Sequence, residues 1–190
     1  MLSRAEVEHK LCDEIVKVLR ETIAQDGKAS LAVSGGSTPL GLFERLAKAD
    51  LDWNKITVIP VDERLVEDGH KDQNGTLIKN HLLQKKAAAA IFYPLVNTAK
   101  DPKNNLKLVI KDLDQLPRPL SVVILGMGTD GHTASLFPKS EALSKGLSLN
   151  FEQPFLNVIP LEAPYQRISM SRNFISKAKH IFLHFYGEEK

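Results

Sequence analysis

Three short apolar runs, each followed at once by glycine or charged residues, constrain this chain most strongly. The runs are SLAV at 30–33, ITVIPV at 56–61 and SVVIL at 121–125. Apolar runs this short are typical of strands that are buried on both faces, as in a parallel sheet. Because stretches with helical periodicity separate the runs, the sequence predicts an α/β fold, a mainly parallel sheet with helices on both faces.

The remaining pattern supplies helices and further strands. Ser3 and Glu6 have the spacing of a capping box, and apolar residues then recur at helical intervals up to Gly27, which predicts a long first helix. Pro39 suits the first turn of a helix over 40–49. Further helices are predicted at 76–86, 104–114 and 173–178, and extended segments at 90–96, 155–160, 167–171 and 180–186.

Length and charge exclude several classes of protein. With 190 residues the chain corresponds to one domain of ordinary size, so we predict a single domain, 1–190. Lys and Arg number 25 against 23 Asp and Glu, and this net charge of +2 is too small to indicate nucleic acid or an anionic membrane as the main partner. The oligomeric state is not indicated, although a monomer is favoured.

The expected compartment is the cytoplasm. The single cysteine, Cys12, cannot form an internal disulfide, and its place on an apparent helix predicts a packed thiol in a reducing environment. The N-terminus carries charges where a signal peptide needs an apolar run. No apolar stretch approaches the roughly 18 residues of a membrane span, so no membrane partner is expected.

In a parallel sheet, ligands bind beyond the carboxyl ends of the strands, and the first polar corner lies at such an end. Gly35 and Gly36 would let the backbone approach an anion, while Ser37 and Thr38 offer hydroxyl groups and the next helix offers unpaired N–H groups. The pattern fits a phosphate-binding loop, and a tight turn with helix caps is an equal alternative. The sequence has no G-x-x-x-x-G-K-[ST] nucleotide loop.

A second glycine-rich corner follows the run at 121–125. The residues GMGTDG match the dinucleotide pattern G-x-G-x-x-G, but the helix-compatible stretch after them stops at Pro138, and no strand with an acidic end follows about 20 residues later. Dinucleotide binding is therefore disfavoured. His132 is well suited to accept and return a proton near neutral pH, although a solvated loop histidine is the alternative.

The third corner is charged, with Asp62, Glu63 and Arg64 after the run at 56–61. Arg64 could donate two hydrogen bonds to a phosphate or to the neighbouring carboxylates, and an exposed ion-paired cluster is the alternative. The sequence has no H-E-x-x-H, paired C-x-x-C or G-x-S-x-G motif, which disfavours a zinc site and a serine hydrolase. The other histidines carry less weight: His9, His70, His81, His180 and His184.

Taken together, these corners resemble the 6-phosphogluconolactonase family. The resemblance implies a Rossmann-like fold, hydrolysis of 6-phospho-D-glucono-1,5-lactone to 6-phosphogluconate in the pentose phosphate pathway, and no metal or organic cofactor. The resembling stretches span nearly the whole chain in family order: LAVSGGSTPLGLFERLA at 31–47, VDERLVEDGHKDQN at 61–74, VVILGMGTDGHTASLFP at 122–138, RISMS at 167–171 and FYGEEK at 185–190.

Carried over position by position, the resemblance implies a role for each candidate residue. His132 matches the base that activates water, and Asp62 and Arg64 complete the expected catalytic group. The expected substrate-binding and phosphate-binding residues are Gly35, Gly36, Ser37, Thr38, Arg64, Gly128, Asp130, Gly131, Arg167 and Lys190.

The chain departs from the family pattern in two places. Glu67 and Gln73 stand where the family more often has proline and serine, and similar proteins continue beyond Lys190 through another strand and a closing helix. The resemblance therefore predicts a domain that lacks this last strand and helix.

Two alternatives remain. Glucosamine-6-phosphate deaminases share the glycine loop and the D-G-H motif, but they typically read I-A-F-N-E-P where this chain has TASLFP at 133–138, and they carry an aromatic residue at the position of Arg64. A non-catalytic sugar-phosphate sensor on the same scaffold is the second alternative.

Overall fold

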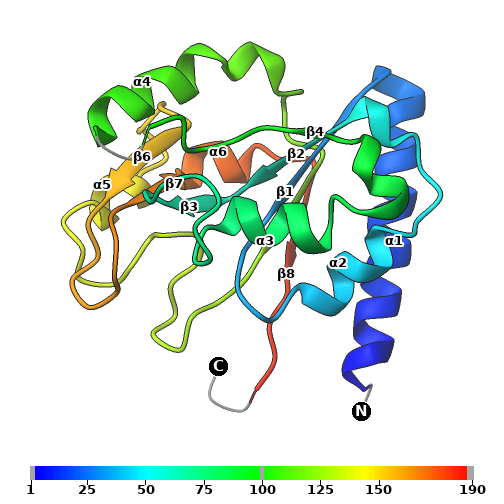
Figure 1. Ribbon diagram of the computed structural model, residues 1–190. Coiled ribbons are helices and arrows are strands. Elements are labelled where there is room, and N and C mark those ends of the chain that lie inside the picture. Colours follow the sequence, from blue (N-terminus) through cyan, green and yellow to red (C-terminus); the bar gives the residue numbers. More distant parts are fainter. Residues whose placement is uncertain (1–2, 99–100, 188–190) are drawn as a thin grey trace.

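A five-stranded sheet forms the centre of the protein (Figure 1). The structure, a computed structural model, describes residues 3–98 and 101–187. The strand order is β4-β2-β1-β5-β8, and each neighbouring pair is parallel. The α/β class with a mainly parallel sheet is therefore confirmed. The strands of this sheet are β1 (Ala29–Val33), β2 (Ile56–Pro60), β4 (Ile91–Phe92), β5 (Val122–Leu125) and β8 (His180–Leu183).

Helices cover both faces of this sheet, as predicted. In Figure 1, α1, α2 and α3 lie on one side, and α4 and α6 lie on the other. The α-helices are α1 (Arg4–Asp26), α2 (Leu40–Leu46), α3 (Asn74–His81), α4 (Pro102–Lys111), α5 (Leu143–Leu147) and α6 (Arg172–Ser176). Short 3₁₀ turns are Trp53–Lys55, Lys85–Ala89 and Leu113–Gln115.

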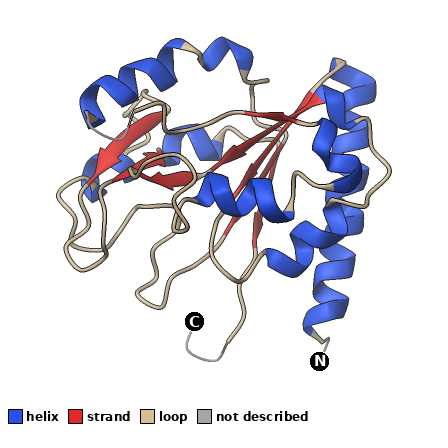
Figure 2. Cartoon of the chain, viewed as in Figure 1, coloured by secondary structure: helices blue, strands red, loops and turns tan. Residues whose placement is uncertain are grey.

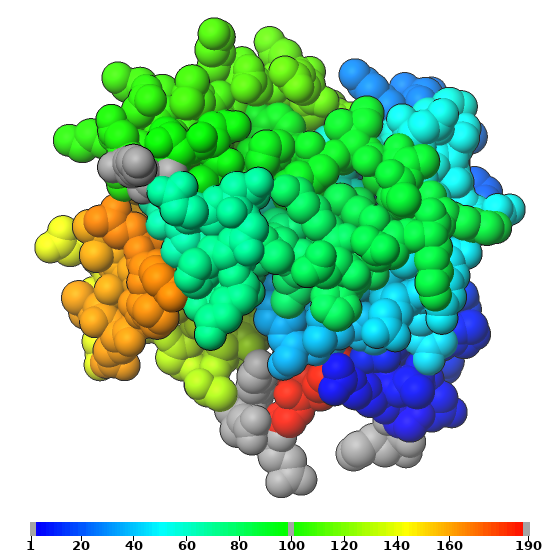
Figure 3. Space-filling view, in the orientation of Figure 1, coloured from blue at the N-terminus to red at the C-terminus, as the bar shows by residue number. Residues whose placement is uncertain are grey.

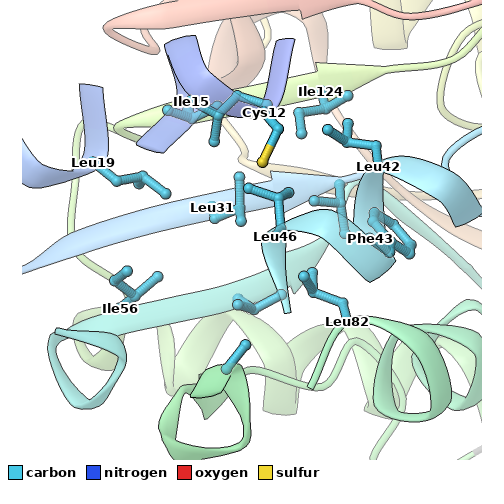
Figure 4. Close-up of a cluster of buried hydrophobic side chains, with 14 of the residues drawn as sticks. Cys12, Ile15, Leu19, Leu31, Leu42, Phe43, Leu46, Ile56, Leu82 and Ile124 are labelled. Carbon is cyan, nitrogen blue, oxygen red and sulfur yellow. The ribbon is translucent and has the colours of Figure 1, made fainter. Parts of the chain in front are cut away.

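The alternation of side chains along β1 separates two cores. Leu31 packs with α1 and α2 in the larger core, shown in Figure 4, whereas the neighbouring Ala32 packs with α4 and α6. Each fully buried large side chain contributes about 1.5–3 kcal/mol to stability. Cys12 lies in the larger core, as predicted, and burial raises the pKa of its thiol to about 11.

A second, antiparallel sheet was not expected from the sequence. It consists of β3 (Asp62–Arg64), β7 (Arg167–Met170) and β6 (Phe155–Val158), in the order β3-β7-β6. Val61 makes the transition between sheets, because its N–H donates to Val33 in the parallel sheet and its carbonyl accepts from the N–H of Met170. The charged corner predicted at 62–64 is thus a strand, hidden in the sequence because Asp62 and Glu63 are buried without being apolar.

Hydrogen bonds to backbone N–H groups and a C-terminal glycine account for the ends of α1 and the start of α3. The predicted capping box between Ser3 and Glu6 is present, and Gly27 ends α1 with a positive φ of 76°. The helix predicted at 76–86 instead begins at Asn74, because the Glu63 carboxylate accepts hydrogen bonds from its first N–H groups. Among the described helices, none has both the length and the apolar character needed to cross a membrane.

Loops gather at the carboxyl ends of the parallel strands. Figure 2 shows the long segments after β1, β5 and β8 on the same side of the sheet. This is the edge where the topology of a parallel sheet places ligands.

Candidate active site

Ser34 joins two strands before the first loop begins. Its backbone N–H and its hydroxyl both donate to the Ile124 carbonyl, at 3.0 and 3.1 Å, and its Oγ accepts from the N–H of Gly126 at 2.9 Å. These bonds fix the carboxyl ends of β1 and β5 relative to each other. The loops at 35–38 and 126–132 therefore start from one rigid point.

The loop at 35–38 presents unpaired backbone donors. Within the described part of the chain, the N–H groups of Gly35, Gly36, Ser37 and Thr38 donate to no protein acceptor. A side chain at Gly35 would place its Cβ 1.9 Å from Asn74 Oδ1, and Gly36 has a φ of 88°, so glycine is required at both positions. Free N–H groups ahead of a helix are the chemistry that the phosphate-loop prediction requires.

Glu63 anchors the segment that follows β3. Its carboxylate is buried and accepts from the N–H groups of Arg64, Asn74 and Gly75 at 2.6–2.7 Å. Burial raises the pKa of Glu63 to about 7, although these three hydrogen bonds oppose the shift. Because its oxygens are used by the backbone, Glu63 holds the start of α3.

Asp62 links the charged corner to the histidine loop. Its Oδ1 and its carbonyl accept from Asn74 Nδ2 at 3.2 and 2.8 Å, and its Oδ2 accepts from the Ser135 hydroxyl at 2.5 Å. The side chain is buried and lies at the wall of the cavity described below. These contacts join β3 to α3 and to the loop that carries His132.

Two arginines lie side by side in the second sheet. Arg64 of β3 is directly opposite Arg167 of β7, with Arg64 Nη1 donating to the Asp72 carbonyl and Arg167 Nη2 to the Pro164 carbonyl. Within the described residues, the Nε of each guanidinium is buried and has no hydrogen-bond partner. Burial and the charge of Arg64 lower the pKa of Arg167. A negative charge bound beside Arg64 would offset this repulsion.

The glycine-rich corner after β5 pairs a histidine with a carboxylate. His132 Nδ1 lies 2.5 Å from Asp130 Oδ1, which also accepts from the His132 backbone N–H at 3.2 Å. Burial raises the pKa of Asp130, but the hydrogen bonds from His132 outweigh it and hold the pKa below its ordinary value. The ring packs on Phe137 with centroids 4.2 Å apart, so both its position and its orientation are restrained.

The three corners enclose one cavity of about 250 Å³. In Figure 3 the turquoise surface of the segment after β3 adjoins the yellow-green surface around residue 130. The wall combines backbone N–H groups, a guanidinium and an imidazole paired with a carboxylate, which suits an anionic substrate that must lose or gain a proton. It is formed by residues 34–39, Asp62, Arg64, Asn74, residues 124–128, His132, Ala134 and His184.

Most of the residues predicted from the sequence meet in this cavity, but not all. Asp130 touches it through His132, and Arg167 lies beside Arg64 without lining the wall. Gly131 turns the loop with a φ of 82°. Lys190 lies outside the described residues. Of the predicted residues, those that line the wall are Gly35, Gly36, Ser37, Thr38, Asp62, Arg64, Gly128 and His132.

Three residues of the site were missed by the sequence analysis. Asn74 and Ser135 bond to Asp62 across separations of 12 and 73 residues, for which no local signal exists. His184 was assigned to a strand running to 186, but β8 ends at Leu183. His184 therefore lies at the carboxyl end of a parallel strand, the position at which a ligand-binding residue is expected.

No cluster of three or more His, Cys, Asp or Glu side chains is arranged to hold a metal ion in the described part of the chain. The expectation that no metal is required remains a prediction.

Comparison with known proteins identifies the family. The sequence profile described as glucosamine-6-phosphate isomerases/6-phosphogluconolactonase matches residues 2–190. The chain belongs to this family. Within it, a 6-phosphogluconolactonase from Pseudomonas aeruginosa is 38% identical over 188 residues, covering 99% of this chain and 79% of the relative. One from Neisseria meningitidis serogroup A is 36% identical over 188 residues, covering 98% and 81%.

The fold of the family agrees with the structure. A crystal structure of a 6-phosphogluconolactonase from Shewanella baltica has a TM-score of 0.95 and 38% sequence identity, and the match covers 100% of this chain and 80% of that chain. The family resemblance stated from the sequence motifs and the Rossmann-like α/β class are both confirmed.

Proposed function

We propose that this chain hydrolyses 6-phospho-D-glucono-1,5-lactone to 6-phospho-D-gluconate, with His132 as the general base. The relatives named 6-phosphogluconolactonase support this activity at 36–38% identity over nearly the whole chain. The single observation that carries the proposal is that an imidazole paired with a carboxylate and a loop of unpaired N–H groups line the same cavity.

The phosphate group binds at the loop over 35–38. Its free N–H groups supply donors without formal charge, and Arg64 and Arg167 supply the positive charge that a dianion needs. Lys190 belongs to this binding group by family resemblance.

Asp130 fixes the tautomer of the base. When His132 Nδ1–H donates to Asp130, the lone pair of Nε2 is free to take a proton from water. The resulting hydroxide equivalent attacks the lactone carbonyl carbon and forms a tetrahedral intermediate. Asp130 then stabilises the imidazolium.

The intermediate collapses by breaking the bond between the carbonyl carbon and the ring oxygen. The imidazolium returns its proton to that departing oxygen, which becomes the hydroxyl group of the open-chain product. The product acid ionises in water. A δ-lactone is a reactive ester, so hydrolysis needs no covalent enzyme intermediate.

The oxyanion of the intermediate is stabilised by Arg64 or by the N–H of Met127. Gly126, Gly128 and Gly131 already donate their N–H groups within the protein. Met127 is the residue of that loop that lines the cavity and whose N–H has no acceptor in the described part of the chain.

A turnover assay separates the proposal from its alternatives. The purified chain is supplied with 6-phosphogluconolactone or with glucosamine 6-phosphate, and spontaneous lactone hydrolysis is subtracted. Hydrolysis of the lactone alone supports the proposal. Ammonia release from glucosamine 6-phosphate would indicate a deaminase, and binding without turnover would indicate a sensor.

The proposal extends to cofactor, domain and compartment. We propose that the reaction needs no metal, so activity should survive exhaustive chelation, and a loss restored by a divalent cation would contradict this. We also propose that the chain acts as a single cytoplasmic domain on a small molecule. Size-exclusion chromatography tests whether one copy of the chain acts alone, and cell fractionation tests the compartment.

A further inference from the structure

Three side chains hold the carbonyl side of the loop at 35–38. The Tyr186 hydroxyl lies 2.6 Å from the Thr38 carbonyl and 2.9 Å from Glu8 Oε1. Arg4 Nη2 donates to the carbonyls of Thr38 and Ser37 at 3.2 and 3.5 Å. Arg4 and Glu8 belong to α1, whereas Tyr186 follows β8, so elements far apart in the chain meet at this loop.

Glu8 is the centre of this arrangement. It is only 5% exposed, and Arg4 Nε donates to its Oε1 at 2.9 Å. Burial raises the pKa of Glu8, but the hydrogen bonds from Arg4 and Tyr186 outweigh it and hold the pKa below its ordinary value. A side chain at Gly41 would place its Cβ 2.3 Å from Glu8 Oε2, so glycine leaves the space that the carboxylate occupies.

The Tyr186 ring is held on two sides. The Arg4 guanidinium lies 4.2 Å from the ring centroid, and the buried His184 ring meets it edge-on at 5.3 Å and 81°. Burial and the contact with Glu8 raise the pKa of Tyr186 to about 12, which keeps its hydroxyl protonated. Its single proton is shared between the Thr38 carbonyl and Glu8 Oε1.

We propose that Arg4, Glu8 and Tyr186 form a carbonyl clamp whose role is to position the 35–38 loop for phosphate binding. The Ser37 carbonyl and the Thr38 N–H belong to one planar peptide group and point in opposite directions, so holding the carbonyl away from the cavity turns the N–H toward it. The Thr38 carbonyl precedes Pro39, which has no N–H. Holding that carbonyl outward removes a partial negative charge from an anion site.

The clamp rests on the proposed function, because phosphate is the ligand that it prepares the loop to bind. The three residues are positioning residues, since their contacts are with the loop and with one another. They should therefore affect the binding of phosphate more than the chemical step at His132.

The test replaces Tyr186 by phenylalanine, which keeps the ring and removes only the hydroxyl. Affinity for inorganic phosphate is measured by calorimetry, and lactone hydrolysis gives kcat and KM. Loss of the hydroxyl should weaken phosphate affinity and raise KM by about 5- to 10-fold, with kcat within about twofold of wild type. Arg4→Lys, which keeps the charge and loses the planar fork, should act in the same direction.

Tyr93→Phe is the matched control. The Tyr93 hydroxyl also donates to a backbone carbonyl, that of Val109 at 2.5 Å, but it lies in the other core. This variant should lose thermal stability while keeping wild-type phosphate affinity and KM.

The outcomes separate the clamp from the proposed function. If the wild-type chain binds phosphate and Tyr186→Phe weakens binding, the clamp is supported even if no lactone is hydrolysed, and only the function then fails. The clamp is overturned if Tyr186→Phe keeps wild-type phosphate affinity, if it lowers kcat with KM unchanged, or if the wild-type chain binds no phosphate.

Discussion

Two glycine-rich loops leave adjacent strands of the same sheet, and they use their backbone N–H groups in opposite ways. After β1, the N–H groups of 35–38 find no acceptor in the described part of the chain. After β5, Gly126 donates to Ser34 Oγ, Gly128 to the His132 carbonyl and Gly131 to the Gly128 carbonyl. The first loop leaves its N–H groups free for a ligand, whereas the three glycines of the second loop donate theirs to acceptors within the protein.

This difference shows why glycine spacing alone does not reveal function. The GMGTDG segment matches a dinucleotide pattern, yet its glycines serve a side chain: a Cβ on Gly128 would lie 2.3 Å from His132 Nδ1. The GGST segment matches no nucleotide motif but offers the free donors that bind anions. Assigning an acceptor to each backbone N–H group therefore distinguishes the 35–38 loop, which can bind a ligand through its backbone, from the 126–132 loop, which positions the His132 side chain.

The largest effect is expected from His132→Asn. Asparagine keeps a polar side chain but removes the basic nitrogen, so kcat should fall by roughly 10²–10⁴ with KM little changed. His180→Asn, a change at an exposed position of β8, should leave both constants unaltered. Near-normal kcat in His132→Asn, or an acyl-enzyme trapped by mass spectrometry, would contradict the proposal that His132 activates water as a general base.

Asp130→Asn should lower kcat about 100-fold, because a neutral amide neither fixes the tautomer of His132 nor stabilises the imidazolium. Steady-state kinetics measure this, with Asp114→Asn as the control, since Asp114 pairs with Arg118 on the surface. A larger loss in Asp62→Asn than in Asp130→Asn would show that Asp62 is the catalytic partner instead.

Arg167→Met should weaken phosphate binding about 10- to 100-fold. Methionine preserves the apolar stem and removes the charge-assisted donors, each of which contributes about 1.5–3 kcal/mol. Calorimetry with inorganic phosphate checks this, with the exposed Arg118→Met as the control. Unchanged affinity would place the phosphate away from the antiparallel sheet.

The smallest effects are expected from glycine substitutions, which should change KM in the 35–38 loop and kcat in the 126–132 loop. Gly35→Ala forces Asn74 to move and should raise KM about tenfold, whereas Gly128→Ala displaces His132 and should lower kcat about tenfold. Gly27→Ala introduces strain at a positive φ far from the site and should change stability alone. If both loop variants change the same constant, the distinction between the loops fails.

The sequence predicts what local patterns determine. The ends of α1 could be predicted from Ser3, Glu6 and Gly27, because caps act within one turn. The three apolar runs could be predicted as strands, because a strand that is buried on both faces needs a continuous apolar run. The D-G-H segment also carried a local signal for its own geometry, since Asp130 accepts from the His132 N–H two residues later.

The second sheet and parts of the site depend on distant contacts. The buried carboxylates of Asp62 and Glu63 are satisfied by hydrogen bonds from Asn74, Gly75 and Ser135. Because these strand residues are charged, no apolar alternation in the sequence indicates β3. The position of His184 depends on β8 ending at Leu183, and strand ends are set by pairing with β5.

The most direct test of the central contrast is a titration of the ¹⁵N-labelled chain with inorganic phosphate, followed by NMR. The backbone N–H signals of residues 35–38 should shift and become protected from exchange, while those of Gly126, Gly128 and Gly131 should change little. Shifts confined to the 126–131 loop, with the 35–38 signals unmoved, would contradict this contrast.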